Sequence, residues 1–290
     1  MKAFNEQRGY NMWSIGIMQG RLTEPKGRGI QFFPFDNWEE EFIIAKEIGL
    51  DEIEFIFDYD NYTANPIWQS SGEKVKKISD ETGIRVKSIC FDYFMRRPFF
   101  KYSNIDKEEV LRENKEIIDR VLYNMSQVGI SLIEIPLVDD SSLKNEQEAN
   151  EFRDFLLPIV QNAPENILFG LETDLPPKQF KDYLDSFGLK RIGANYDSGN
   201  SSGIGYLPYE EVTTLKNYIF NVHIKDRVYQ GTTVELGTGS ADFKELFRGL
   251  KEINYKGSFI LQAARGCEGA EKDTICKQSR FIRNWIKTLE

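Results

Sequence analysis

Four residues that can bind a metal ion recur along the second half of the chain, each at the end of a short apolar run. They are Glu172 in GLETD, Asp197 in NYDSGN, His223 in NVHIKD and Gln262 in ILQAARG. His223 is the only histidine of the 290 residues. Three oxygen donors and one imidazole nitrogen suit a hard or borderline divalent cation, first Mn²⁺, with Mg²⁺, Co²⁺ or Zn²⁺ as alternatives. The set predicts a single divalent metal site.

Each of these residues also has an ordinary structural explanation. A lone histidine at a strand end is often a hydrogen-bonded ring in the core, and a lone Asp or Glu commonly caps the helix that follows. Four such residues on four successive strands are harder to explain in that way. We therefore expect the metal site, provided that the fold brings the four side chains together.

The elements that must position them alternate regularly. Short β-branched or apolar runs, each followed by a helical pattern, predict eight strands at 14–18, 52–57, 85–91, 131–137, 166–172, 191–197, 218–224 and 258–262. Helices are predicted between them, for example at 37–50, 108–129 and 241–255. The glycines at 49, 83, 129 and 188 are expected to end their helices as C-cap residues.

Eight strand–helix units predict an α/β fold, a single-domain (β/α)8 TIM barrel over residues 13–290, preceded by a flexible leader at residues 1–12. A doubly wound sheet is the rival fold. It is disfavoured because no GxGxxG follows the first strand and the units run evenly to the end. In a barrel the active site lies at the carboxyl ends of the strands, so the four candidate ligands can converge.

Composition excludes several classes of protein. The net charge is −9 and no block of Lys and Arg is present, which argues against nucleic-acid binding. The three cysteines, Cys90, Cys267 and Cys276, show no CxxC spacing, which argues against a disulfide framework or a cysteine-rich zinc site. No apolar stretch is long enough to span a membrane, and the first residues lack a signal-peptide pattern. We expect a cytoplasmic protein without a membrane or nucleic-acid partner.

The same residues carry a family resemblance. The chain resembles the xylose-isomerase-like TIM barrels, which include sugar-phosphate isomerases and epimerases, ketose epimerases and inosose dehydratases. The resemblance lies in GIMQGRL, NWEEEFIIAKEIGLDEIEF, HIKDR and GTGSADFKELFRGLKEINYKGSFILQ. It implies that one metal is held at Glu172, Asp197, His223 and the position of Gln262, where the family has Glu. It also implies a homo-oligomer, and Asn200 stands where the family often has a substrate-contacting His.

Gln262 affects the mechanism that the resemblance implies. The family's epimerases use two glutamates on opposite faces of a sugar, and Gln262 cannot exchange a proton, so Glu172 is left as the base. One base suffices for a 1,2-isomerisation or for the start of a dehydration, whereas epimerisation needs a second acid–base group. Candidates are Asp92, just past the third strand, and Glu134, if its side chain faces the lumen instead of the helices. The orientation of Glu54 is equally open.

Substrate-binding candidates are cations and an amide near the strand ends. Arg227 and Arg265 follow the last two strands, where barrels often bind phosphate, and the GTGS loop at 237–240 could add backbone N–H groups. The alternative is that both arginines form salt bridges at the rim. Lys225 could polarise a hydroxyl or pair with Asp226. Arg21 and Asn200 complete the candidates.

The expected function is a metal-dependent isomerase or epimerase acting on a sugar or sugar phosphate. The alternatives are a dehydratase of the inosose type and a barrel that has lost its chemistry and binds a sugar, the latter suggested by Gln262.

Overall fold

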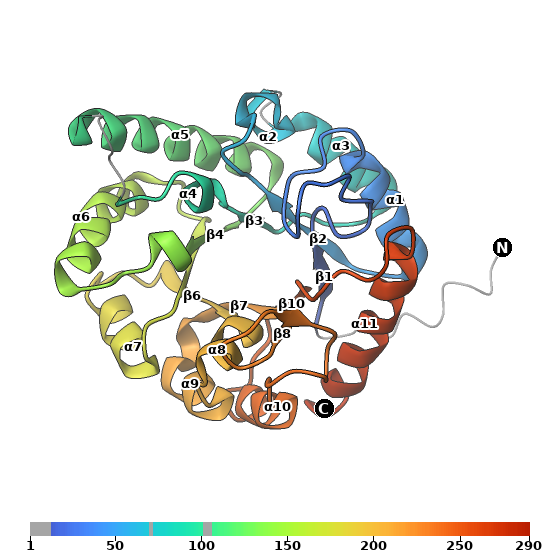
Figure 1. Ribbon diagram of the computed structural model, residues 1–290. Coiled ribbons are helices and arrows are strands. Elements are labelled where there is room, and N and C mark those ends of the chain that lie inside the picture. Colours follow the sequence, from blue (N-terminus) through green and yellow to red (C-terminus); the bar gives the residue numbers. More distant parts are fainter. Residues whose placement is uncertain (1–12, 70–71, 101–105) are drawn as a thin grey trace.

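The eight predicted strands form a closed parallel barrel with helices around it (Figure 1). The computed structural model describes residues 13–69, 72–100 and 106–290. The predicted fold class is thereby confirmed. The leader predicted at residues 1–12 lies outside the described residues.

The barrel strands follow the predicted runs closely. They are β1 (Ile15–Met18), β2 (Glu52–Ile56), β3 (Ser88–Cys90), β4 (Leu132–Leu137), β5 (Leu168–Thr173), β6 (Ile192–Asp197), β7 (Ile219–Ile224) and β10 (Ser258–Leu261). Their spatial order is β1-β10-β7-β6-β5-β4-β3-β2, closed between β2 and β1. Candidate ligands on β5, β6, β7 and just past β10 therefore come from four adjacent strands.

Helices cover the outside of the barrel, as Figure 1 shows. The helices are α1 (Trp38–Ile48), α2 (Pro66–Gln69), α3 (Glu73–Thr82), α4 (Tyr93–Arg96), α5 (Lys107–Val128), α6 (Glu146–Asn162), α7 (Pro177–Asp185), α8 (Ser198–Ile204), α9 (Pro208–Leu215), α10 (Phe243–Glu252) and α11 (Glu271–Ile286). None of the described helices is long and apolar enough to cross a membrane.

Helix ends agree with the predicted caps at three of four positions. Gly49, Gly83 and Gly129 adopt the left-handed conformation directly after α1, α3 and α5. The prediction for Gly188 was wrong, because α7 ends at Asp185 and its C-cap is Ser186. Gly188 instead has a φ of 64° in the turn that leads to β6.

Alternation along the strands separates an apolar outer layer from a polar lumen. In β7 the outward-facing Val222 and Ile224 are fully buried, while Asn221 and His223 face inward. The contact of His223 with Glu54 joins β7 to β2 across the barrel, since these two strands are not neighbours in the sheet. A barrel interior filled by Val, Ile and Leu is the usual arrangement, so carboxylates in the lumen indicate a site.

Candidate metal and catalytic site

A cavity of about 430 Å³ opens at the carboxyl ends of the strands. Its lining includes seven of the predicted site residues: Asp92, Glu134, Glu172, Asn200, Lys225, Arg227 and Gln262. It also includes loop residues that the sequence did not single out, among them Arg28, Gln31 and Arg96. The structure therefore brings most of the predicted site together at the expected end of the barrel.

Three predicted metal ligands converge at the base of this mouth. Glu172, Asp197 and His223 each offer one ligand atom, and these atoms lie within 4.8 Å of one another. All three residues are buried. Adjacent strands produce the convergence, because Asp197 on β6 pairs in register with His223 on β7.

Two amides hold the carboxylate of Glu172. The Nδ2 atom of Asn195 donates to Glu172 Oε2 at 2.7 Å, and that of Asn200 donates to Oε1 at 2.5 Å. The Nδ2 atom of Asn195 also lies 3.1 Å from Nδ1 of His223. Asn195 was not predicted as a site residue from the sequence. Its position two residues before Asp197 nevertheless places both side chains on the lumen face of β6.

Asp197 is both a helix cap and a candidate ligand. Its Oδ1 accepts hydrogen bonds from the backbone N–H groups of Gly199 and Asn200, each at 2.8 Å, and so caps α8. Its Oδ2 faces Lys225 Nζ at 3.4 Å. The Lys225 stem passes so close to α8 that a Cβ on Gly199 would lie 2.4 Å from Lys225 Cγ. The capping explanation and the ligand explanation are therefore compatible.

Gln262 is oriented by a chain of hydrogen bonds. Its Nε2 donates to Gln31 Oε1 at 2.9 Å, and its Oε1 accepts from Lys225 Nζ at 3.4 Å. Gln31 Oε1 also faces the guanidinium of Arg21 at 3.5 Å. Because Arg21 and Lys225 can only donate hydrogen bonds, they orient the side-chain amides of Gln31 and Gln262. The oxygen of Gln262 therefore faces Lys225, which also contacts Asp197. The sequence gives no signal for Gln31, which lies in the loop after β1.

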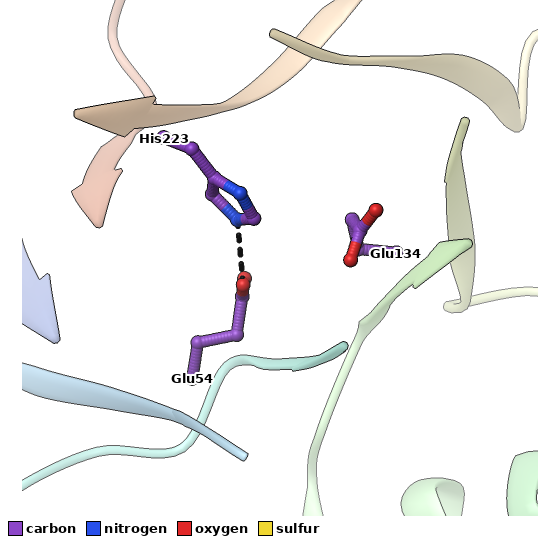
Figure 2. A group of neighbouring side chains, drawn as sticks. All are labelled: Glu54, Glu134 and His223. Atoms are coloured by element: carbon purple, nitrogen blue, oxygen red, sulfur yellow. Dashed lines mark hydrogen bonds and ion pairs between the residues drawn. The ribbon is translucent and has the colours of Figure 1, made fainter. Parts of the chain in front are cut away.

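Glu134 and Glu54 both face the lumen, which answers the question of their orientation. Figure 2 shows His223 and Glu54 directed towards one another and Glu134 pointing into the same space from β4. Neither carboxylate oxygen of Glu134 receives a hydrogen bond, and the side chain is buried beside the Cys90 thiol. Burial, and next the charge of Glu172, raises the pKa of Glu134 well above its ordinary value.

Asp92 follows β3 and Glu172 lies on β5, the two strands that flank β4. Glu172 pairs with Pro136 of β4, and Asp92 follows β3 two residues beyond Cys90, the partner of Glu134. Burial raises the pKa of Asp92 to about 6. A carboxyl group with this pKa can both accept and release protons near neutral pH.

His223 is enclosed by carboxylates. Its Nε2 lies 2.6 Å from Glu54 Oε1, and its Nδ1 lies 3.5 Å from Glu172 Oε2. Burial alone would lower the pKa of His223, but the charges and hydrogen bonds of Glu54 and Glu172 outweigh it and raise the pKa well above its ordinary value. The ring thus sits in a strongly negative environment, with Nδ1 on the side of the candidate ligands.

The predicted substrate-binding arginines divide into two groups. Arg227 lines the cavity and donates to Asn200 Oδ1 at 3.2 Å and to the Gly231 carbonyl. Arg265 binds the carbonyl oxygens of Gly20, Thr23 and Ile30, and its guanidinium carbon lies 5.0 Å from the ring centre of Phe32. Arg265 is not among the described residues that line this cavity.

Arg21 also lies behind the cavity wall and is not among its described lining residues. It donates to the Ala263 carbonyl at 2.8 Å. Burial, with the charge of Arg265, lowers its pKa to about 9. Arg21 and Arg265 thus fasten the loop after β1 to the segment after β10.

The GTGS loop does not offer free amides to an anion, and this expectation was wrong. The backbone N–H groups of Gly237, Gly239 and Ala241 all donate to the carboxylate of Asp226, at 2.9 to 3.0 Å. Asp226 begins β8 (Asp226–Arg227), which pairs with β9 (Thr233–Val234) in an antiparallel ribbon. The anion held by this loop is therefore the protein's own side chain, and Lys225 faces Asp197 instead of Asp226.

The donor set fits a divalent cation. Glu134, Glu172 and Asp197 gather in a buried space, where Lys225 is the only described lysine or arginine within 4.0 Å of one of these carboxylates. Burying several carboxylates without matching positive charge is unfavourable, and a bound cation removes that imbalance. Oxygen ligands with one imidazole suit Mn²⁺, Co²⁺ or Zn²⁺.

Known proteins are similar to this chain in sequence and in fold. The chain is 26% identical over 269 residues to L-ribulose-5-phosphate 3-epimerase UlaE of Escherichia coli K12, covering 86% of this chain and 89% of that protein. Its fold is similar to that of D-allulose 3-epimerase from Methylomonas sp., with a TM-score of 0.72, 15% identity and coverage of 94% and 96%. It is also similar to the IOLI protein with a bound zinc atom, with a TM-score of 0.73, 15% identity and coverage of 96% and 99%.

The family model described as xylose isomerase-like TIM barrel matches residues 42–285, which include every candidate ligand and most of the barrel. The chain belongs to the xylose isomerase-like TIM barrel family.

Proposed function

We propose that this protein is a divalent-metal-dependent isomerase or epimerase of a sugar or sugar phosphate. The observation that carries the proposal is the convergence of Glu172, Asp197 and His223 at a cavity that also contains Asp92 and Glu134. The relatives support the class of substrate, since L-ribulose-5-phosphate and D-allulose are named for two of them.

One divalent ion, first of all Mn²⁺, would be held by Glu172, Asp197, His223 and the oxygen of Gln262. When bound, it would supply positive charge near the substrate oxygens that become negative during proton removal. Gln262 is suited to this position because its oxygen faces Lys225, the same side chain that contacts the candidate ligand Asp197.

Glu172 would remove the proton next to the substrate carbonyl. Its carboxylate is fixed by Asn195 and Asn200, so it is positioned before the substrate enters. Positioning of a base in this way is a recognised source of rate acceleration.

Asp92 would return the proton on the other side of the substrate. Asp92 follows β3 and Glu172 lies on β5, and strands two apart in a sheet are separated by about 10 Å, which leaves room for a sugar carbon. A pKa of about 6 allows Asp92 to carry a proton near neutral pH. This arrangement would supply the second acid–base group that Gln262 cannot.

Glu134 would act as a neutral acid below Glu172. Its raised pKa favours the protonated form, so it can hold a proton beside Glu172. Its proton would be available to a substrate oxygen that reaches the base of the cavity.

Lys225, Asn200 and Arg227 would orient the substrate hydroxyl or phosphate groups at the mouth. Arg21 and Arg265 would act by holding the loop that carries Gln31.

The test is exchange of substrate carbon-bound hydrogen with solvent. Mn²⁺-loaded protein would be incubated in D₂O with ketopentoses and ketohexoses, with and without a terminal phosphate, and followed by proton NMR. Deuterium incorporation next to the carbonyl, together with a new epimer or isomer, is expected for at least one sugar. Loss of water without isomerisation would instead identify a dehydratase.

Binding of a sugar without exchange in any of them would contradict the proposal. That result would favour a barrel that has lost its chemistry, the alternative suggested by Gln262.

A further inference from the structure

Glu54 is a buried carboxylate that neither the ligand set nor the proposed proton transfers use. It lies on the lumen face of β2 and is fully buried. Its Oε1 lies 2.6 Å from His223 Nε2, and its Oε2 accepts hydrogen bonds from Ser88 Oγ at 2.6 Å and Asn221 Nδ2 at 2.8 Å. Three partners therefore fix both oxygens of this one side chain.

We propose that Glu54 is a positioning residue that holds the proton of His223 on Nε2 and so keeps the Nδ1 lone pair directed at the metal site. This inference rests on the proposed metal site. It concerns Glu54, which lies outside the proposed ligand set and would act through the imidazole ring. Glu54, Glu134 and His223 also lie close enough together to hold an ion, and metallation of the ring at Nε2 would identify that alternative.

The geometry on the two sides of the ring supports this role. Figure 2 shows the Nε2 side of His223 facing Glu54, and that carboxylate oxygen can only accept. On the other side, Nδ1 lies beside Glu172 Oε2 at 3.5 Å and Asn195 Nδ2 at 3.1 Å. A carboxylate behind a metal-binding imidazole fixes its tautomer and its orientation.

Replacement of Glu54 by glutamine should reverse the tautomer. Asn221 Nδ2 can only donate, so the new amide would turn its oxygen to Asn221 and its NH₂ group to His223. Nε2 of the ring would then have to accept, and the proton would move to Nδ1, where it excludes a metal ion. The substitution replaces one carboxylate oxygen by an NH₂ group and scarcely alters the volume of the side chain.

Glu52 offers a matched control on the same strand. Its side chain also faces the lumen and is buried, but it pairs with Lys87 Nζ at 2.8 Å and has no contact with His223 among the described interactions. Glu52→Gln removes the same charge two residues away. It should leave the tautomer of His223 unchanged.

The experiment uses the single histidine as its own probe. The full chain, labelled with ¹⁵N only in histidine, shows one pair of ring nitrogens, observed before and after addition of the diamagnetic ion Zn²⁺. Wild-type protein with zinc should carry its proton on Nε2 and its metal-induced shift on Nδ1. Glu54→Gln should weaken zinc binding by roughly 10- to 100-fold and place the proton on Nδ1 in the metal-free protein.

Three results would overturn the inference. One is a wild-type ring metallated at Nε2. Another is a Glu54→Gln protein with the wild-type tautomer and zinc affinity. The third is an equal loss of affinity in Glu52→Gln, which would indicate a general effect of lumen charge. If Glu54→Gln does not fold, the wild-type spectrum with zinc still decides which ring nitrogen is metallated and which carries the proton. Absence of zinc binding in the wild type would instead contradict the proposed metal site.

Discussion

The two ends of the barrel lumen contain buried carboxylates in very different surroundings. At the amino-terminal end Glu52 pairs with Lys87 at 2.8 Å and lies 3.9 Å from Arg85, and both cations reach solvent. At the carboxyl-terminal end Lys225, which lies 3.4 Å from Asp197, is the only described lysine or arginine within 4.0 Å of Glu134, Glu172 or Asp197. The buried carboxylate at one end has cationic side chains beside it, whereas at the other end the carboxyl groups outnumber the nearby lysines and arginines.

The difference in cationic partners indicates which carboxylates stabilise the fold and which serve the site. A paired carboxylate such as Glu52 can be explained by the fold alone. An excess of buried carboxylate destabilises the protein and persists where a ligand or a reaction needs it. The carboxyl-terminal end of the lumen is therefore where substitutions should affect chemistry most.

Glu172→Gln should have the largest effect. The amide preserves the shape of the side chain but cannot accept the substrate proton, so the rate of solvent deuterium exchange should fall on the order of 10³-fold. Asn195 and Asn200 donate to this carboxylate, so the amide also disturbs its positioning. Retention of more than a tenth of the exchange rate would remove Glu172 as the base.

A pair of substitutions tests the balance of charge directly. Lys87→Met, at the amino-terminal end, should lower the free energy of unfolding by about 1–2 kcal/mol because Glu52 loses its partner. Glu134→Gln, at the other end, should raise it by about 1–3 kcal/mol in metal-free protein at pH 7, because no charge then has to be buried or neutralised.

Urea unfolding of the two variants beside the wild type measures both changes. The stabilised Glu134→Gln should also lose activity, a trade-off common at functional sites. Changes of the same sign in the two variants would mean that the ends of the lumen do not differ as described.

Gln262→Glu should strengthen metal binding by roughly tenfold. A carboxylate at this position adds a charged ligand atom beside Asp197 and Lys225. Competition with a fluorescent chelator would measure the dissociation constant. Weaker binding in the variant would indicate that the Gln262 amide is not part of the ligand group.

The smallest expected effect is a change in the pH dependence of stability, caused by substitution of Glu211, a buried carboxylate outside the lumen. Glu211 on α9 accepts hydrogen bonds from Tyr196 and Ser201, and burial raises its pKa to about 7 from 4.5. The folded protein then keeps a proton that the unfolded chain releases, so stability falls as pH rises from 4.5 to 7.

Glu211→Gln should remove this part of the pH dependence. The Tm of the variant minus the Tm of the wild type should increase by about 2–4 °C from pH 4.5 to pH 7.5, as measured by differential scanning calorimetry. An identical pH profile in the two proteins would contradict the assignment. Glu211 is not among the candidate ligands, so the variant should still bind the metal ion.

The sequence predicted the barrel well because its strands have a local signal. Each strand is a short apolar run, and the carboxyl end of each run marks where a site must lie. Glu172, Asp197, His223 and Gln262 could therefore be placed together from strand order alone.

The parts that escaped prediction depend on side-chain direction and on loops. Whether Glu134 and Glu54 faced the lumen could not be decided from alternation alone, because both faces of a barrel strand are buried. Gln31 reaches Gln262 from a distant loop, 231 residues away in the sequence. The amides of the GTGS loop look free in the sequence, since nothing local shows that Asp226 occupies them.

The most direct test of the central claim is the metal content of wild-type and His223→Ala protein. Both would be reloaded with equal amounts of Mn²⁺, Co²⁺ and Zn²⁺, desalted and measured by elemental mass spectrometry. The wild type should retain about one ion per chain and the variant almost none, because the imidazole is the only nitrogen ligand in the set. Equal metal content in the two proteins, or none in the wild type, would contradict a metal site built on His223.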